Sequence, residues 1–152
     1  MLWQFAPLTE FAVELAGVTG GAPRICLLAT GMGDDSRIVA AFYDAALRGL
    51  APDVAVPPRR SHVRQVFHTY VIQAEARTKL IAHLDAHGVE TKIHYPIPIH
   101  LQKAAEHLGY KRGAFPVCEA QSERILSLPI HEHLSSDEQA YVVERIREFY
   151  RG

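Results

Sequence analysis

Prolines divide this chain of 152 residues into two parts. Three prolines, followed by two arginines, lie between residues 51 and 60. Each proline pushes the residue before it toward extended backbone geometry, so we expect no helix or central strand to run through this stretch. The sequence therefore predicts a linker over residues 51–60, which joins a first segment, residues 1–50, to a second, residues 61–152.

The first segment has the pattern of a helix, a strand and a second helix. A short amphipathic helix is expected to end near Gly17, and the apolar run from Arg24 to Thr30 is typical of a strand buried on both faces. After a glycine turn, a side chain within Asp34–Ser36 can cap a helix whose apolar residues recur at helical spacing as far as Leu50.

The second segment alternates short strands with helices. Strands are predicted at residues 65–72, 91–94 and 125–128, and helices at 77–87, 99–108, 116–125 and after the capping box Ser135–Glu138. This order predicts an α+β fold, with a small mixed or antiparallel sheet and helices on one face, preceded by the helix–strand–helix segment. Cys118 is expected to be a small core residue. The strand at residues 24–30 needs neighbours on both edges, and the sheet and helices of the second segment would normally pack against another domain, so we predict an exposed apolar patch and self-association.

Composition excludes several classes of protein. Sixteen basic and seventeen acidic residues nearly cancel, so we expect no nucleic-acid partner and no attraction to an anionic membrane. No apolar run reaches the roughly 18 residues that a membrane-spanning helix needs. Two distant cysteines predict neither a disulfide framework nor a zinc knuckle, and a cytoplasmic location is the default.

Nine histidines are the first candidates for chemistry. His83 and His87 are four residues apart on a predicted helix, a spacing that suits a metal. The favoured interpretation is that they complement the helix dipole in its last turn, because no third ligand is evident. The order His131-Glu132-His133 is not that of a zinc protease. No metal site is therefore predicted.

His94, Tyr95 and His100 flank a segment locked by prolines just after a predicted strand. Loops held by a rigid scaffold often carry function. A histidine beside a tyrosine can donate to a phosphate or a sugar hydroxyl, and ordinary packing is the alternative.

This segment belongs to a longer motif. Residues 67–72 and 88–102, which include His-Tyr-Pro-Ile-Pro-Ile-His-Leu-Gln, resemble the C-terminal small domain of DegT-type (DegT/DnrJ/StrS) pyridoxal-phosphate-dependent sugar aminotransferases. Further matches lie at residues 108–110, 115–117, 126–129 and 141–150.

The resemblance implies the small domain of a fold-type I aminotransferase, which closes over pyridoxal phosphate held mostly by a large domain. It implies that His94, Tyr95, His100 and, more weakly, Gln102 contact a nucleotide-sugar substrate. It assigns no catalytic and no cofactor-binding residue to this chain. The implied partners are an aminotransferase large domain or further copies of the chain.

The lysine that forms the Schiff base belongs to the family's large domain, and nothing before Arg60 resembles that domain. The lysines of this chain all lie within small-domain segments: Lys79, Lys92, Lys103 and Lys111. We therefore expect no covalent binding of pyridoxal phosphate and no transamination by this chain alone. A nucleotide-sugar-binding or interaction module without catalysis is the alternative.

The first fifty residues are similar to the start of dipeptidase E-like serine peptidases. The similarity rests on Leu15–Gly17, Pro23–Thr30, Gly33–Asp34 and Phe42–Tyr43. That family's serine elbow is absent, so a hydrolase remnant is a remote alternative. The join near residues 51–60 would then be a natural fusion, an engineered chimera or a gene-assembly artefact.

Overall fold

A computed structural model describes residues 34–63 and 65–152 of the chain. The predicted first helix, the predicted strand at residues 24–30 and the glycine turn after it lie outside the described residues. Most of the peptidase-like similarity lies outside them too.

Three short strands form an antiparallel sheet in the order β1-β2-β3. The strands are β1 (Val54–Ala55), β2 (Tyr70–Ala74) and β3 (Ile125–Leu128). Val54 pairs with Ala74, and Tyr70 pairs with Leu128. Of the two predicted sheet types, the antiparallel one is found.

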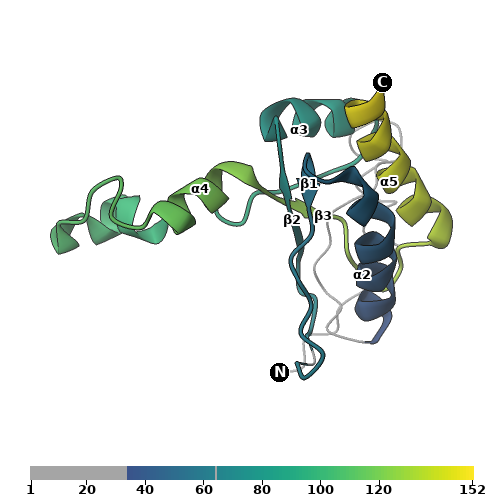
Figure 1. Cartoon of the computed structure of the whole chain (residues 1–152), viewed down its shortest axis with the longest axis horizontal. Helices are drawn as coiled ribbons and strands as arrows, with labels where there is room; N and C mark the ends of the chain where they lie inside the picture. Colours follow the sequence, from purple (N-terminus) through teal and green to yellow (C-terminus); the bar gives the residue numbers. More distant parts are fainter. Residues whose placement is uncertain (1–33, 64) are drawn as a thin grey trace, which may run out of the picture.

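Helices cover the sheet and extend beyond it (Figure 1). The α-helices are α2 (Asp34–Leu47), α3 (Arg77–Ala86), α4 (Pro116–Arg124) and α5 (Ser136–Arg151), and the 3₁₀ turns are η1 (Arg48–Leu50), η2 (Ile99–Leu101) and η3 (Lys103–Leu108). Both α2 and α3 pack on α5. Residues 98–124, here called the arm, project away from this body (Figure 1). The predicted α+β class is confirmed.

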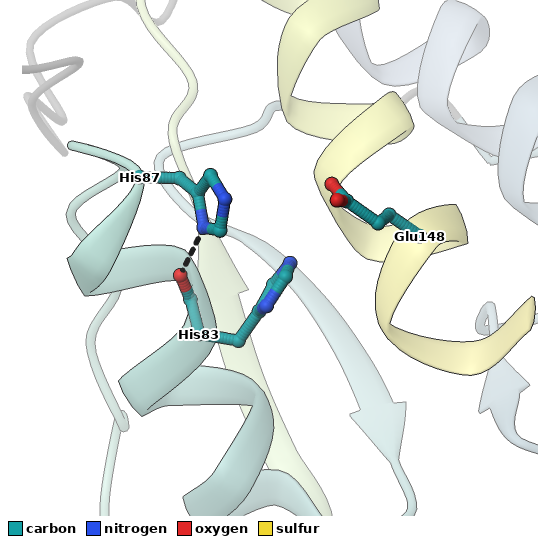
Figure 2. Close-up of side chains that lie close together, drawn as sticks. All are labelled: His83, His87 and Glu148. Carbon is teal, nitrogen blue, oxygen red and sulfur yellow. Dashed lines mark hydrogen bonds between the residues drawn. The ribbon is translucent and has the colours of Figure 1, made fainter. Parts of the chain in front are cut away.

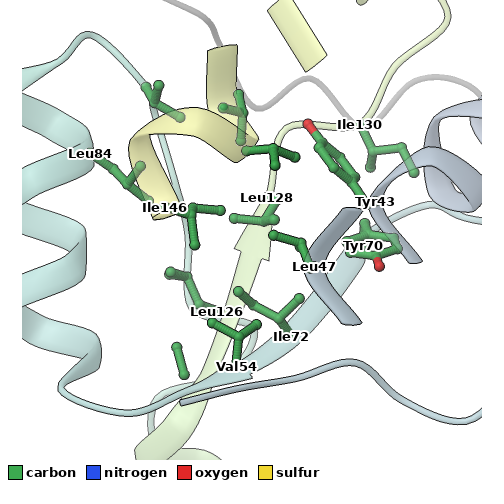
Figure 3. Packing of buried hydrophobic residues seen from close by; sticks show 14 of the residues in the cluster. Tyr43, Leu47, Val54, Tyr70, Ile72, Leu84, Leu126, Leu128, Ile130 and Ile146 are labelled. Carbon is green, nitrogen blue, oxygen red and sulfur yellow. The ribbon is translucent and has the colours of Figure 1, made fainter. Parts of the chain in front are cut away.

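One apolar core joins α2, the sheet and α5 (Figure 3). Leu47 of α2, Ile72 of β2 and Ile146 of α5 are all fully buried within it. Val54 of β1 is buried in the same core, although it lies in the stretch predicted as a linker. The prolines around it therefore allow a two-residue edge strand, which needs few ladder hydrogen bonds.

Signals at the helix ends are confirmed. The Ser135 hydroxyl accepts from the Glu138 amide at 3.3 Å, and the Glu138 carboxylate accepts from the Ser135 amide at 2.8 Å, so the capping box at α5 is complete. Gly88 and Gly109, predicted to stop two helices, have positive φ angles of 75° and 72°.

Three predicted elements differ in the structure. The strand predicted at residues 65–72 begins only at Tyr70, because its partner on β3, Leu128, is followed by Pro129, which has no N–H for the ladder. The strand predicted at residues 91–94 is reduced to one bridge between Lys92 and Ser127. The helix predicted at residues 99–108 is instead η2 and η3, because Gln102 between them is extended (φ −77°, ψ 147°).

The prediction that Cys118 is a core residue is wrong. Cys118 is exposed, and its helix α4 lies in the arm, which projects from the body (Figure 1). Exposed large apolar side chains, which the predicted patch requires, are present. Most of them lie on the arm and on the loop before it: Tyr95, Ile97, Ile99, Leu108, Tyr110, Phe115 and Val117. Four others lie on α2 and in the stretch before β2: Ile38, Phe42, Val63 and Val66.

Among the described residues, none of the helices has both the length and the apolar character needed to cross a bilayer.

Candidate functional site

The loop after Ile93 presents His94 and Tyr95 side by side. His94 Nδ1 lies 2.9 Å from the hydroxyl oxygen of Ser127, a buried residue of β3. The backbone of Lys92 pairs with that of Ser127 in both directions, at 2.8 and 3.3 Å. Strand β3 therefore fixes both the backbone before His94 and its imidazole.

Tyr95 is turned toward solvent. The exposed fraction of this residue is 71%, and its ring stands edge-on to the His94 ring at a centroid distance of 6.0 Å. The peptide bond between the two residues is cis. A phenol hydroxyl and an imidazole nitrogen are thus available together at the surface, and both can form hydrogen bonds with a phosphate or a sugar hydroxyl.

Gln102 forms a hydrogen bond with the loop before the arm, and His100 contacts residues of the arm. Gln102 Nε2 donates to the carbonyl oxygen of Ile97 at 3.0 Å, which closes the turn that contains the prolines. His100 is only 9% exposed, and its Nε2 lies 2.9 Å from Glu119 Oε1 on α4. The His100 ring also packs edge-on against Phe115 at 4.8 Å.

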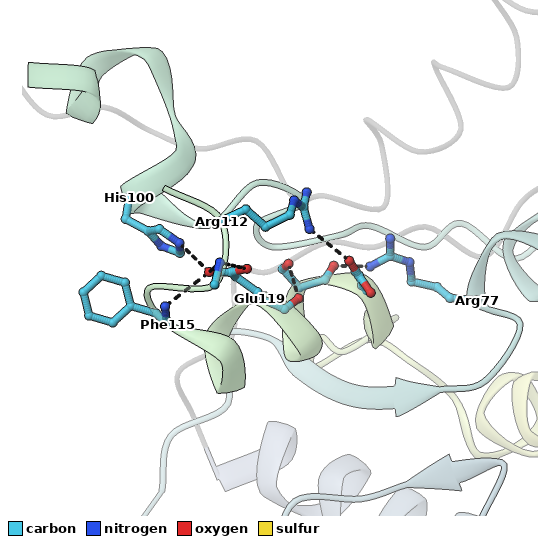
Figure 4. A network of polar contacts seen from close by, with 8 residues as sticks. Arg77, His100, Arg112, Phe115 and Glu119 are labelled. Carbon is cyan, nitrogen blue, oxygen red and sulfur yellow. Dashed lines mark hydrogen bonds and ion pairs between the residues drawn. The ribbon is translucent and has the colours of Figure 1, made fainter. Parts of the chain in front are cut away.

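Glu119 organises the arm around His100 (Figure 4). Its carboxylate accepts from the amide of Gly113 at 2.8 and 2.9 Å and from the amide of Phe115 at 3.2 Å. The hydrogen bond from the Gly113 amide is the main reason that the pKa of Glu119 lies below its usual value, and burial opposes this shift. The Phe115 amide and His100 lower the pKa further. The carboxylate therefore stays charged and holds the arm's turn.

Two arginine contacts tie α4 to the body. Arg77 Nη1 of α3 donates to the carbonyl oxygens of Ser122 and Ile125 (Figure 4), and Arg124 Nη2 lies 2.6 Å from Glu75 Oε1. The arm's base, which leads directly into β3, is thereby fixed on the same strand that holds His94.

The four residues singled out from sequence thus divide into two pairs. His94 and Tyr95 lie together at the surface, whereas His100 and Gln102 contact other parts of the loop and arm. Ser127 and Glu119, which orient these residues, were not found from sequence. No sequence pattern marks either of them, because each meets its partner only through the fold.

The lysines do not fit the covalent binding of pyridoxal phosphate. All four lysines of the chain are exposed, and Lys92 is paired with Glu90 at 2.7 Å. A Schiff-base lysine is ordinarily desolvated so that its amine is reactive at neutral pH. None of these lysines has that environment.

Comparisons with known proteins agree on one family. The model of the DegT/DnrJ/EryC1/StrS aminotransferase family matches residues 31–147. The match starts well before residue 61, where the sequence predicted the aminotransferase-like domain to begin. It therefore includes α2 and β1.

Two curated relatives illustrate the similarity. The chain is 42% identical over 113 residues to a pleiotropic regulatory protein of Geobacillus stearothermophilus, covering 74% of this chain and 30% of the relative. It is 35% identical over 111 residues to the dTDP-3-amino-3,4,6-trideoxy-alpha-D-glucose transaminase of Streptomyces venezuelae, covering 73% of this chain and 29% of the relative. The chain therefore spans about 30% of the length of these relatives.

Solved structures show the same fold. DesV of S. venezuelae, in complex with a ketimine intermediate, aligns with a TM-score of 0.74 at 33% identity, over 78% of this chain and 32% of DesV. A DegT DnrJ EryC1 StrS aminotransferase from Brucella abortus aligns with a TM-score of 0.70 at 36% identity, over 78% of this chain and 31% of the enzyme.

Proposed function

Because this chain belongs to the DegT/DnrJ/EryC1/StrS aminotransferase family, we propose that it supplies the C-terminal small domain of a nucleotide-sugar aminotransferase dependent on pyridoxal phosphate. We also propose that the chain does not transaminate alone. The observation that carries both parts is the exposed pair His94–Tyr95, held on β3 in a chain whose lysines do not suit a Schiff base.

The proposed role of His94 and Tyr95 is to contact the nucleotide-sugar substrate at the mouth of the active site. Their hydrogen-bonding groups suit its phosphates and hydroxyls. With Nδ1 engaged by Ser127, His94 has Nε2 left for a ligand. Since His100 and Gln102 already have partners in the arm and loop, we propose that they position this loop.

The proposed partner is an aminotransferase large domain, which would hold the cofactor and cover the apolar arm. The exposed side chains there, such as Ile99 at 75% and Val117 at 71%, are more apolar than a solvated surface requires. A large domain from a separate chain, or self-association of this chain, would bury them.

We propose that this small domain begins near residue 31 and not at residue 61. Support comes from the start of the family match and from the core that Leu47 and Val54 share with α5. Any peptidase-like part would then be limited to residues before it. An exposed free thiol at Cys118 suits a reducing cytoplasm, where we place the protein.

The first test asks whether the chain alone binds pyridoxal phosphate covalently and transaminates. The purified chain is mixed with pyridoxal phosphate and an amino donor, and the imine absorbance band is followed. We expect no band that depends on a lysine. Such a band, converting when donor is added, would overturn the claim that the chain is inactive alone.

The second test supplies the missing part. The segment of the S. venezuelae relative that this chain does not match is mixed with the chain, pyridoxal phosphate and a dTDP-sugar. We expect transamination only in the mixture. The rate should be at least tenfold lower when the chain carries Tyr95→Ala. The control, Ile38→Ala, removes an exposed side chain from α2, outside the arm, and should retain activity. No gain over the relative's segment alone would contradict the proposal.

A binding module without catalysis is the second candidate, favoured by the surface position of Tyr95. Titration of the chain alone with UDP- or dTDP-sugars, followed through histidine resonances, distinguishes it. A micromolar affinity with a shift at His94, and no gain of activity in the mixture, would favour the module.

A further inference from the structure

Two histidines of α3 and a glutamate of α5 converge outside the proposed substrate site (Figure 2). His83 and His87 lie one turn apart on the same face of α3, with ring centroids 4.3 Å apart. Glu148 points toward them from the neighbouring helix (Figure 2). One ligand atom of each residue lies within 4.8 Å of those of the others. Glu148 is thus a third potential ligand, which the sequence did not reveal.

Backbone carbonyls fix the hydrogen on each imidazole. His87 Nδ1 lies 2.8 Å from the carbonyl oxygen of His83, and His83 Nε2 lies 3.0 Å from that of Arg145. A carbonyl only accepts, so each of these nitrogens carries a hydrogen, and the other nitrogen of each neutral ring has a lone pair. Histidines that bind metals commonly donate their second ring N–H to a carbonyl in this way.

The local charges also suit a cation. His83 and His87 are close to the C-terminal end of α3, and Glu148 is close to that of α5, where the helix dipoles place partial negative charge. Arg145 opposes this, with Nη1 2.6 Å from Glu148 Oε2. Its guanidinium is also paired with Glu144 at 3.1 Å and lies over the ring of Tyr141. Glu148 retains a second carboxylate oxygen for a metal.

We propose that His83, His87 and Glu148 bind a divalent transition metal ion of the zinc class. Two imidazole nitrogens and one carboxylate oxygen form a donor set that zinc accepts, with water as the fourth ligand. Ligands in a tetrahedral zinc site stand roughly 3.3 Å apart, so the three side chains, whose ligand atoms lie within 4.8 Å of one another, must close by up to about 1.5 Å. Glu148 is exposed and can rotate to do so. The ion would fasten the end of α3 to the last turns of α5.

Titration of the chain with Zn²⁺ alone tests the proposal. Calorimetry should give one ion per chain, and Zn²⁺ should raise the midpoint of thermal unfolding, whereas Mg²⁺ should do neither. His87→Gln should weaken Zn²⁺ affinity at least tenfold and Glu148→Gln at least threefold. Glu144→Gln is the matched control, because it also removes an ion pair with Arg145 and should leave the affinity unchanged.

Imidazole nitrogen spectra of the unaltered chain provide a second measurement that needs no variant. Zn²⁺ should shift the resonances of His83 and His87 first. A first shift at His131 and His133, an unchanged affinity in both ligand variants, or no binding below millimolar Zn²⁺ would each overturn the proposal.

Discussion

Arg59 donates to both carboxylate oxygens of Asp44, with each distance at 2.8 Å. This pair connects the stretch predicted as a linker to α2. The Asp44 carboxylate also accepts from the Tyr70 hydroxyl at 2.7 Å, and the Arg59 guanidinium lies 4.9 Å from the ring centroid of Phe67. The stretch after β1 is therefore fastened to the helix before it and to the strand after it.

Asp44→Asn should destabilise the protein in a manner that depends on pH. Burial alone would raise the pKa of Asp44, but hydrogen bonds from Arg59 and Tyr70 outweigh it and lower the pKa. A carboxyl whose folded pKa is lowered stabilises the fold fully above its unfolded pKa, about 3.9, and this is lost as the pH falls through the folded pKa. The pair is partly exposed, so we expect a loss of about 1 kcal/mol at pH 7.

Urea unfolding of both proteins at pH 7 and pH 3 measures this effect. The difference between wild type and Asp44→Asn should shrink at pH 3. Asp53→Asn, at an exposed position directly before β1, is the control and should change little at either pH. An equal difference at both pH values would contradict the assignment.

Glu119→Gln should loosen the arm without unfolding the body. The carboxylate accepts from the amides of Gly113 and Phe115 and pairs with His100, whereas the core lies in the body. We expect faster hydrogen exchange at these two amides and unchanged exchange in α5. Because the folded pKa of Glu119 is lowered, the protection should be fully present above the unfolded pKa, about 4.3, and lost as the pH falls through the lower folded pKa.

Glu123→Gln is the control for this prediction. Glu123 is on the same helix, and its contact with Arg112, at 3.4 Å, is exposed. It should leave the Gly113 and Phe115 amides protected. Equal exchange in both variants would mean that Glu119 does not hold the arm.

Ser135→Ala should lower the free energy of unfolding by about 1 kcal/mol, the usual cost of losing an N-cap. The hydroxyl of Ser135 accepts from the Glu138 amide, which has no partner within the helix. Ser136→Ala, one residue later and exposed, should be nearly neutral. Urea unfolding of the two variants checks this, and equal midpoints would show that the capping box contributes nothing.

Elements with local signals could be predicted from the sequence. The capping box at Ser135 marked the beginning of α5, and Gly88 and Gly109 marked the ends of two elements, because caps and left-handed glycines depend on a few neighbouring residues. The fold class followed from the order of these elements.

Features set by distant residues could not be predicted. The pairing of β2 begins at Tyr70 because its partner, Leu128, is the last residue of β3 and is followed by Pro129, which has no N–H. His100 was predicted to contact a nucleotide-sugar substrate, and no local signal indicated its burial against Glu119, which the arm brings to it. Glu148 comes close to His83 and His87 because α3 packs on α5. In each case, the decisive partner is remote in sequence.

Tyr43→Phe tests how α2 is joined to the end of the sheet. The Tyr43 hydroxyl donates to the carbonyl oxygen of Pro129 at 3.0 Å, and the ring is fully buried (Figure 3). Removal of the hydroxyl leaves a buried carbonyl without that donor, so we expect a loss of about 1–2 kcal/mol in urea unfolding at pH 7. Tyr110→Phe, at an exposed position on the arm, should be neutral.

Alkaline pH adds an independent check on Tyr43. Burial, with a smaller effect of Glu138, raises the pKa of Tyr43. A raised folded pKa stabilises the fold fully below the unfolded pKa, about 10, and the stabilisation is lost as the pH rises further. The wild type should therefore lose more stability than Tyr43→Phe between pH 9 and pH 11. Parallel losses in the two proteins would mean that the Tyr43 hydroxyl is not held in the core.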